Sequence, residues 1–409
     1  MVLKELAFFG LGALTGGVTS SVIIADKVMS REVELPFSPH KHQYSVEEFE
    51  EFGEFEFTYY YDKFSGAFNK VASEHTNALN SMGFKVRKRG IHEYLVRFEH
   101  EPEYLNDFAI VHPLFFTRIE ALKFLKKCHR YIVAFEVADT TQISKDYADY
   151  ANDKRLDAIF LPSTFAMETY KRSGVQNNIR LIPHGVNGIF QKPKDEVSTN
   201  NPRLMKLRED KRTKILYFAL HSVQTRKGGD VVRESLKKLQ AKDFVLVVKT
   251  FPSPMDFDAE EYFSGIPVIK IADWLSEEDL VYLYDSCDIL IHPYRGGAFE
   301  LNPYEALARG LPTIVTGWGS VLDYANIHNS YLISPKSCSK LFPTTLWGHI
   351  GYGVNPDVDH CVELLEFVMG NMEYCKKKAR REQKEFSSRT WYSVIDQFLK
   401  ECRSIWETH

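Results

Sequence analysis

The stretch RGGAFELNPYEALARGLPTIVTG, residues 295–317, carries the signals of a turn, a helix and a strand in succession. It follows CDILIHPY, residues 287–294, whose apolar run is typical of a buried strand. Asn302 stands where a helix N-cap is expected, Pro303 at the first helical position and Gly310 at the C-terminal stop. The stretch therefore predicts one strand–helix–strand unit of a parallel α/β sheet.

Two carboxylates, Glu300 and Glu305, lie at the predicted start of this helix. Glu305 comes three residues after Asn302, which is the capping-box position, and in that interpretation it would only satisfy the main chain. The alternative is a ligand, because open α/β sheets bind ligands beyond the carboxyl ends of their strands. There the N–H groups of Gly297–Leu301 would face a pyrophosphate, and a carboxylate would accept hydrogen bonds from ribose hydroxyls.

Apolar runs of strand length recur along the whole chain, with helical stretches between them. This alternation predicts parallel sheets with crossover helices, and hence two Rossmann-like, doubly wound α/β domains. The runs are ELAFFG, FAIVHP, YIVAFE, LDAIFLPS and IRLIPHG in the first half, and KILYFAL, FVLVVKT, IPVIKIAD, CDILIHPY and PTIVTG in the second.

The polar, proline-containing stretch 191–212 interrupts this pattern, as interdomain linkers usually do. We expect a first domain at residues 1–190, a linker at 191–213 and a second domain at 214–385. We expect residues 386–409 to form a C-terminal helix that packs back on the first domain.

Composition is that of an ordinary globular protein, with 409 residues and a net charge of −4. This charge gives no general attraction to nucleic acid, so we expect no nucleic-acid partner. The six cysteines are scattered without a zinc-site spacing, which favours reduced thiols and a cytoplasmic location.

The N-terminal segment Ala7–Ala25 lacks charge and resembles a signal peptide or a membrane span. Glycines and hydroxyl residues interrupt its middle, where a spanning helix would be most apolar. We therefore expect a short strand at Leu6–Gly10, a glycine loop that includes Gly16 and Gly17, and a helix that opens near Thr19.

The basic stretch KKKARREQKEF, residues 376–386, allows two interpretations. One is a solvated helix face, which charge runs usually form. The other is contact with an anionic acceptor or with the cytoplasmic face of a membrane.

GGAFELNPYEALARGLPTIVT resembles the signature of retaining GT-B glycosyltransferases of the large family 4 (glycosyl transferases group 1). The resemblance implies that Glu305 binds the ribose of a nucleotide-sugar and that the donor diphosphate lies on Gly297, Ala298, Phe299, Glu300 and Leu301. The family has a further glutamate eight residues before the ribose glutamate, and this chain has Gly297 there. We expect Glu300 to take over the contact with the donor sugar.

Two further segments match the family in order along the chain. KILYFALHSVQTRKGG, residues 214–229, resembles the segment whose cations neutralise the donor phosphates, which assigns Arg226 and Lys227 to that task. LDAIFLPSTFAMETYKRSGV, followed by IPHGV, resembles the end of the first domain.

The resemblance also suggests residues for the acceptor site in the first domain. In YIVAFEVADTT the family often has a histidine near the position of Glu136, close to the transferred sugar. Glu136 would orient the acceptor or act as a base, and the alternative is a half-buried carboxylate bound by nearby backbone. Gly16 and Gly17 resemble the family's glycine loop, while His112 and His184 are expected to be structural.

The resemblance implies a retaining, metal-independent hexosyltransferase with no bound cofactor. Its substrate would be a nucleoside-diphosphate-sugar of the UDP or GDP type, and its acceptor a glycan or a lipid-linked molecule. The first domain would bind the acceptor and the second the nucleotide-sugar.

Two alternatives stay open on the sequence. The triplets DFD (Asp256 to Asp258) and DVD (Asp357 to Asp359) would suit a metal-dependent glycosyltransferase of another fold. The glycine at position 297 would suit a non-catalytic protein that binds sugar-nucleotides or glycans.

Overall fold

The computed structural model describes residues 55–96, 104–219, 226–241, 243–251, 258–342 and 348–408. The N-terminal expectations, including Gly16 and Gly17, lie outside the described residues, and so does Asp256.

The first sheet contains six parallel strands in the order β2-β1-β3-β4-β5-β6. Non-consecutive neighbours in this order require crossover connections, as the alternating pattern predicts. The strands are β1 (Glu56–Tyr61), β2 (Lys85–Gly90), β3 (Asn106–His112), β4 (His129–Phe135), β5 (Ala158–Leu161) and β6 (Ile179–Leu181).

The second sheet is also parallel and six-stranded, in the order β12-β11-β10-β7-β8-β9. Its strands are β7 (Thr213–Phe218), β8 (Phe244–Lys249), β9 (Val268–Ile271), β10 (Ile289–His292), β11 (Thr313–Thr316) and β12 (Tyr331–Ile333). A separate antiparallel hairpin pairs β13 (Pro335–Lys340) with β14 (Tyr352–Pro356).

Two helical layers cover the first sheet. One face packs on α3 (Gly66–Ser81), and the other packs on α4 (Ile119–Cys128), α5 (Lys145–Ala151) and α6 (Thr164–Arg172). Each layer encloses its own apolar cluster, so the inner strands β1, β3, β4 and β5 are buried on both sides.

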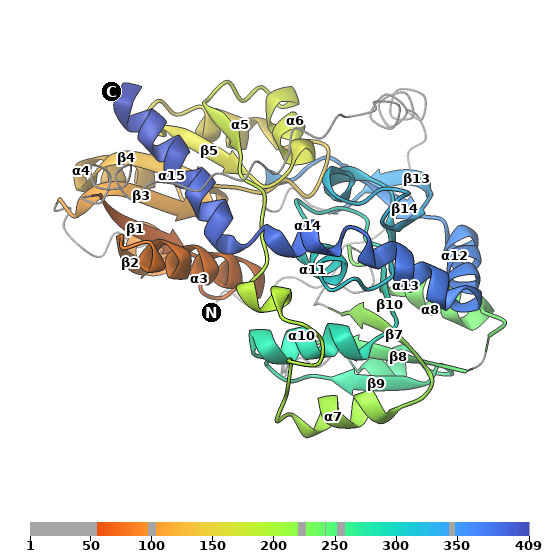
Figure 1. Cartoon of the computed structure of the whole chain (residues 1–409). Helices are drawn as coiled ribbons and strands as arrows, with labels where there is room; N and C mark the ends of the chain where they lie inside the picture. The colour runs from red at the N-terminus through yellow and green to blue at the C-terminus, as the bar shows by residue number, and fades with distance from the viewer. Residues whose placement is uncertain are drawn as a thin grey trace, which may run out of the picture. The chain divides into compact units, whose positions relative to one another are not determined.

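The C-terminal helix α15 (Trp391–Thr408) joins the face that α3 covers. In Figure 1 it runs beside the first sheet, while α14 (Gln383–Ser388) and α13 (Met372–Arg380) lead into it from the second sheet. Phe398 from α15 packs against Phe57, Phe135 and Phe160 of the strands. The expected return of the C-terminal helix to the first domain is confirmed.

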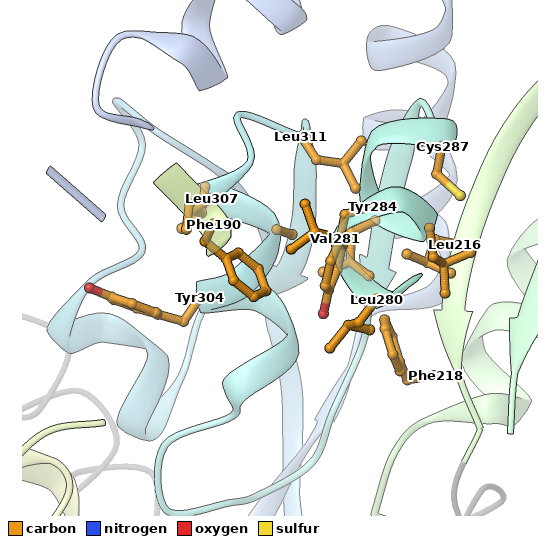
Figure 2. Packing of buried hydrophobic residues seen from close by; sticks show 14 of the residues in the cluster. Phe190, Leu216, Phe218, Leu280, Val281, Tyr284, Cys287, Tyr304, Leu307 and Leu311 are labelled. Carbon is orange, nitrogen blue, oxygen red and sulfur yellow. The ribbon is translucent and has the colours of Figure 1, made fainter. Parts of the chain in front are cut away.

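The second sheet is covered by α10 (Glu277–Ser286) and α11 (Leu301–Ala308) on one face, and by α8 (Gly229–Lys238), α9 (Ala259–Tyr262) and α12 (Val358–Gly370) on the other. Figure 2 shows the first of these clusters, in which Tyr284 of α10 and Phe190 point toward one another. Their ring centroids lie 6.1 Å apart.

The stretch expected to be only a linker contains a further helix, α7 (Pro202–Glu209). Asn201 caps it by accepting a hydrogen bond from the Arg203 N–H, and Pro202 occupies its first turn. Leu204 and Leu207 pack into the core beside α10. The start signal was present in the sequence, but the polar composition of the stretch obscured it.

Candidate active site

A buried ion pair joins the loop before α8 to the start of α11. Lys227 Nζ lies 2.5 Å from Glu300 Oε2, and both side chains are almost fully buried. Gly228 allows this loop to approach the segment after β10 closely, because any residue with a side chain would place its Cβ 1.9 Å from the carbonyl oxygen of Pro293. Since both segments follow strands at the carboxyl edge of the second sheet, the pair lies where such sheets bind ligands.

Glu300 has a left-handed backbone conformation, with φ 63° and ψ 82°. Helix α11 begins directly after it, at Leu301, so the prediction of Asn302 as N-cap and Pro303 as first helical residue is wrong. The left-handed residue turns the chain earlier than the Asn-Pro signal indicates. Gly310, with φ +65°, ends the helix as predicted.

Three basic side chains converge on the Glu300 carboxylate. Besides Lys227, His292 Nε2 lies 2.5 Å from Oε2, and an Arg226 guanidinium nitrogen lies 3.5 Å from Oε1. Burial alone would raise the pKa of Glu300, but Lys227, His292 and Arg226 outweigh it and hold the pKa well below its ordinary value. Glu300 is therefore an anion in the folded protein.

His292 was not singled out from the sequence. It ends β10 and is fully buried, and burial lowers its pKa despite the carboxylate beside it. A neutral imidazole next to an ionised carboxylate must donate its Nε2–H, which fixes the tautomer. The sequence signal was its position at the end of the strand before the Gly297–Leu301 turn.

The Glu300 side chain fills the space beside Gly297. A Cβ on Gly297 would lie 1.9 Å from Glu300 Oε1. The structure thus brings the carboxylate of Glu300 to the place from which a side chain at position 297 would start.

The Gly297–Leu301 turn is fastened through its carbonyl oxygens. Ser320 donates to the Gly297 carbonyl at 2.7 Å, and the Tyr324 hydroxyl lies 2.7 Å from the Glu300 carbonyl. These bonds occupy carbonyl groups of the turn and do not use its N–H groups, which are the groups that a helix start offers to an anion.

Arg226 also contacts the first half of the chain. Its guanidinium lies 3.6 Å from Asp139, in the segment that follows β4. Both of its carboxylate contacts are longer than the 2.5 Å between Lys227 and Glu300. Arg226 is therefore the more loosely paired cation of the two.

Glu305 lies inside α11, and its side chain is 3% exposed. Its Oε1 accepts from Lys70 at 2.8 Å and its Oε2 accepts from the Tyr284 hydroxyl at 2.7 Å. With Glu300 as N-cap, the capping-box interpretation of Glu305 is wrong.

Glu136 is buried directly after β4, and burial raises its pKa to about 8. Its Oε1 accepts from the N–H groups of Leu114 and Phe115, while the Tyr170 hydroxyl lies 3.3 Å from Oε2. Both oxygens are thus engaged. This geometry favours the backbone-binding alternative for Glu136.

His112 and His184, expected to be structural, are buried and neutral. Burial lowers the pKa of each to about 3. His112 Nδ1 lies 3.1 Å from the Tyr59 hydroxyl, and His184 packs against Trp391 and Phe299.

The acidic triplets serve helix starts where the structure describes them. Asp258 accepts from two N–H groups of α9, and Asp357 accepts from two N–H groups of α12. Asp359 pairs with Lys238 at 2.7 Å. Among the described residues, no group of three or more His, Cys, Asp or Glu side chains is arranged to hold a metal ion.

A surface cavity of about 610 Å³ lies between the start of α10 and the start of α7. It is lined by Ser198–Arg203, Asp273, Ser276, Glu278 and Asp279. None of the predicted donor-binding residues lines it, so we do not connect it with the candidate site.

Part of the basic stretch 376–386 faces inward. Lys376 pairs with Asp288 at 2.9 Å, and Lys378 donates to the Ser330 carbonyl at 2.8 Å. These two lysines join α13 to the second sheet rather than forming a freely solvated face.

Residues 212–345, which contain the Lys227–Glu300 pair, match the family model of glycosyl transferases group 1. The chain carries a glycosyltransferase domain. A protein named "Putative glycosyltransferase 45", from Sulfolobus islandicus filamentous virus, is 28% identical over 339 residues. The match covers 82% of this chain and 90% of that protein.

Solved structures show the same fold. Sucrose-phosphate synthase from Thermosynechococcus elongatus has a TM-score of 0.63 at 13% identity, covering 87% of this chain and 100% of that one. Anabaena HepE in complex with UDP and glucose has a TM-score of 0.61 at 13% identity, covering 86% of this chain and 99% of that one. With the two parallel sheets, these likenesses confirm the predicted GT-B fold.

In the part of the chain that the structure describes, no helix has both the length and the apolar character needed to cross a membrane.

Proposed function

We propose that this glycosyltransferase is a retaining, metal-independent enzyme of family 4. It would transfer a hexose from a nucleoside-diphosphate-sugar of the UDP or GDP type to an acceptor hydroxyl. The observation that carries the proposal is the buried cluster of Arg226, Lys227 and Glu300 at the carboxyl edge of the second sheet. HepE, which has the same fold, was solved with UDP and glucose.

The two cations have different tasks in this proposal. Arg226, whose carboxylate contacts are long, exchanges Asp139 for the donor diphosphate. Lys227, held at 2.5 Å by Glu300, faces the leaving group from a fixed position. A fixed cation stabilises the negative charge that grows on the departing nucleoside diphosphate, without reorganisation at the moment of reaction.

Glu300 takes the role of the glutamate that the family has at position 297. The support is spatial, because its carboxylate already lies where a side chain at Gly297 would begin. From there it would accept hydrogen bonds from donor-sugar hydroxyls. Glu305, on the next turn of the same helix, would bind the ribose.

The acceptor is proposed to bind on the first half, near the carboxyl ends of β3 and β4. Glu136 would position this region by binding Leu114 and Phe115, and Gly16 and Gly17, which lie outside the described residues, would be further contributors. The acceptor class is a glycan or a lipid-linked molecule. We propose a cytoplasmic location, supported by six free cysteines, and contact with the membrane face through the outward-facing part of stretch 376–386.

Metal independence rests on how the diphosphate charge is neutralised. Arg226, Lys227 and the N–H groups of Gly297–Leu301 supply that neutralisation from the protein itself. Asp258, Asp357 and Asp359 are engaged as helix caps or in an ion pair.

The test is a binding panel followed by turnover. UDP, GDP, ADP and their hexose conjugates are compared by thermal shift, because a specific ligand raises the melting temperature by mass action. The donor that binds is then incubated without acceptor, and release of free sugar is followed by NMR. Release of the sugar with its donor anomeric configuration supports a retaining transferase.

The non-catalytic alternative predicts a different outcome. A sugar-nucleotide-binding protein would shift its melting temperature with a donor but release no sugar, with or without glycan acceptors. Inverted configuration of the released sugar would contradict the retaining assignment while leaving the glycosyltransferase assignment intact.

A further inference from the structure

Lys70 extends from the first half of the chain into the second. It lies on α3, which covers the first sheet, and its partners lie on α10 and α11, which cover the second. Its Nζ is 2.8 Å from Glu305 Oε1 and 3.1 Å from Glu277 Oε1. This ion pair therefore joins the two halves at the carboxylate proposed to bind ribose.

The Glu305 carboxylate is held from both sides. Lys70 binds Oε1, and the Tyr284 hydroxyl binds Oε2. Each carboxylate oxygen has two lone-pair sites, so one site on each oxygen is left. Two neighbouring hydroxyls of a ribose, one for each oxygen, match that remaining capacity.

Lys70 is also the cation of an acidic cluster. Glu74 lies one helical turn further along α3, and burial together with Glu277 raises its pKa. Burial would lower the pKa of Lys70, but Glu305 and Glu277 outweigh it and keep the ammonium charged. Without this ammonium, the buried Glu305 carboxylate would lose the hydrogen bond that holds Oε1 and would lie near the acidic side chains of Glu277 and Glu74 with no cation between them.

We propose that Lys70 is a positioning residue that makes the donor site selective for a ribose with free 2′ and 3′ hydroxyls. The inference rests on the proposed function, because it assumes that Glu305 meets a nucleoside diphosphate. In this arrangement the first half contributes to donor recognition as well as to acceptor binding. The donor site is complete only when α3 is docked against α10 and α11.

The test compares UDP and GDP with their 2′,3′-dideoxy analogues by isothermal titration calorimetry. The wild-type protein should prefer the ribose form of its nucleotide by at least about tenfold, because losing a hydrogen bond to a charged group costs about 1.5–3 kcal/mol. Lys70→Met should reduce that preference to about threefold or less, with little change for the dideoxy analogue. Lys70→Arg should restore most of the preference.

Glu305→Gln should remove the same preference, and the double variant should be no worse than either single one, since both changes disrupt one interaction. Lys376→Met is the matched control: Lys376 is 28% exposed and pairs with Asp288 at 2.9 Å, against 25% and 2.8 Å for Lys70 and Glu305. This control should keep the full ribose preference.

Two negative outcomes are distinguishable. If the wild-type protein discriminates ribose and Lys70→Met discriminates equally well, or loses both nucleotides in parallel, Lys70 has only a structural role and the inference is overturned. If the wild-type protein binds neither UDP nor GDP, the proposed function fails and the inference fails with it.

Discussion

The carboxylate of Glu300 occupies the space next to Gly297, so close that a Cβ on Gly297 would lie 1.9 Å from Glu300 Oε1. A side chain at position 297 and the Glu300 carboxylate therefore compete for the same space, and Glu300 would have to leave its present side-chain conformation to admit one. Glu300 adopts a left-handed backbone conformation, which is unfavourable for a residue with a side chain. This conformation turns its carboxylate toward Gly297 and Lys227.

The first prediction is a swap of the two positions. Gly297→Glu alone should lower the melting temperature and donor turnover, because the new side chain meets the Glu300 carboxylate. Gly297→Glu combined with Glu300→Gly should recover turnover to within about tenfold of wild type, since one carboxylate again faces Lys227. Glycine at the left-handed position should also return about 1 kcal/mol of stability.

Glu300→Gly alone is the control for the swap, because it leaves Lys227 buried without its carboxylate. It should lose donor-sugar turnover while still binding the nucleoside diphosphate. If the double variant stays as inactive as Gly297→Glu while folding normally, the equivalence of the two carboxylates is wrong.

The second prediction concerns Lys227. Lys227→Ala should lower kcat by about 10²–10³ and weaken donor binding by less than about tenfold, because the charge it faces grows toward the transition state. Steady-state kinetics and calorimetry with the donor separate the two effects. Lys214→Ala is the control, since Lys214 is also a buried lysine with an aspartate partner, Asp288 at 3.5 Å, but lies at the start of β7. Equal losses in binding and turnover would argue against a leaving-group role for Lys227.

The third prediction uses the raised pKa of Glu136. Because burial raises this pKa from 4.5 to about 8, the folded state binds a proton that the unfolded state releases. The associated stability is present below about pH 4.5 and is lost as the pH rises toward 8. Glu136→Gln does not titrate, so the melting temperature of wild type minus that of the variant should decrease between pH 5 and pH 9.

Turnover of the same variant separates the two roles of Glu136. A residue that binds the backbone of Leu114 and Phe115 should tolerate an amide, with kcat within about tenfold. A folded Glu136→Gln protein whose kcat falls more than about a hundredfold would identify Glu136 as a catalytic base instead.

The fourth prediction concerns metal. Turnover with the identified donor should survive exhaustive EDTA treatment, because protein cations and backbone dipoles neutralise the diphosphate. Asp256→Ala combined with Asp258→Ala should leave donor affinity near wild type, with a stability cost of about 1 kcal/mol for the lost cap of α9. Activity lost on chelation and restored by manganese or magnesium would overturn the mechanism.

Much of the fold followed from the sequence because its strands are buried on both faces. Runs such as CDILIHPY and FVLVVKT became β10 and β8, as continuous apolar segments predict. The strands β1 (Glu56–Tyr61) and β2 (Lys85–Gly90) were not among the predicted runs, and β2 is an edge strand with mostly exposed, basic side chains. β2 is extended because it pairs with β1, and this pairing between distant segments leaves no pattern in the local sequence.

The candidate site was predictable only where its members share a local motif. Arg226, Lys227 and the 297–301 turn carry such motifs, and their convergence on one carboxylate emerged from the fold. Lys70 has no local signal, because its partner Glu305 lies 235 residues further along the chain. The left-handed conformation of Glu300 was equally hidden, since glutamate gives no indication of a positive φ.

The return of α15 to the first sheet affects how the chain is made. A ribosome releases the strands of the first sheet before those of the second, but Phe398 and its neighbours, which complete the first core, are synthesised only after the second sheet. Until α15 is made, the face that α3 covers therefore stays partly exposed while the second sheet is translated. Folding of the two halves is thus coupled in time, because the core of the first sheet is completed only after the second sheet has been made.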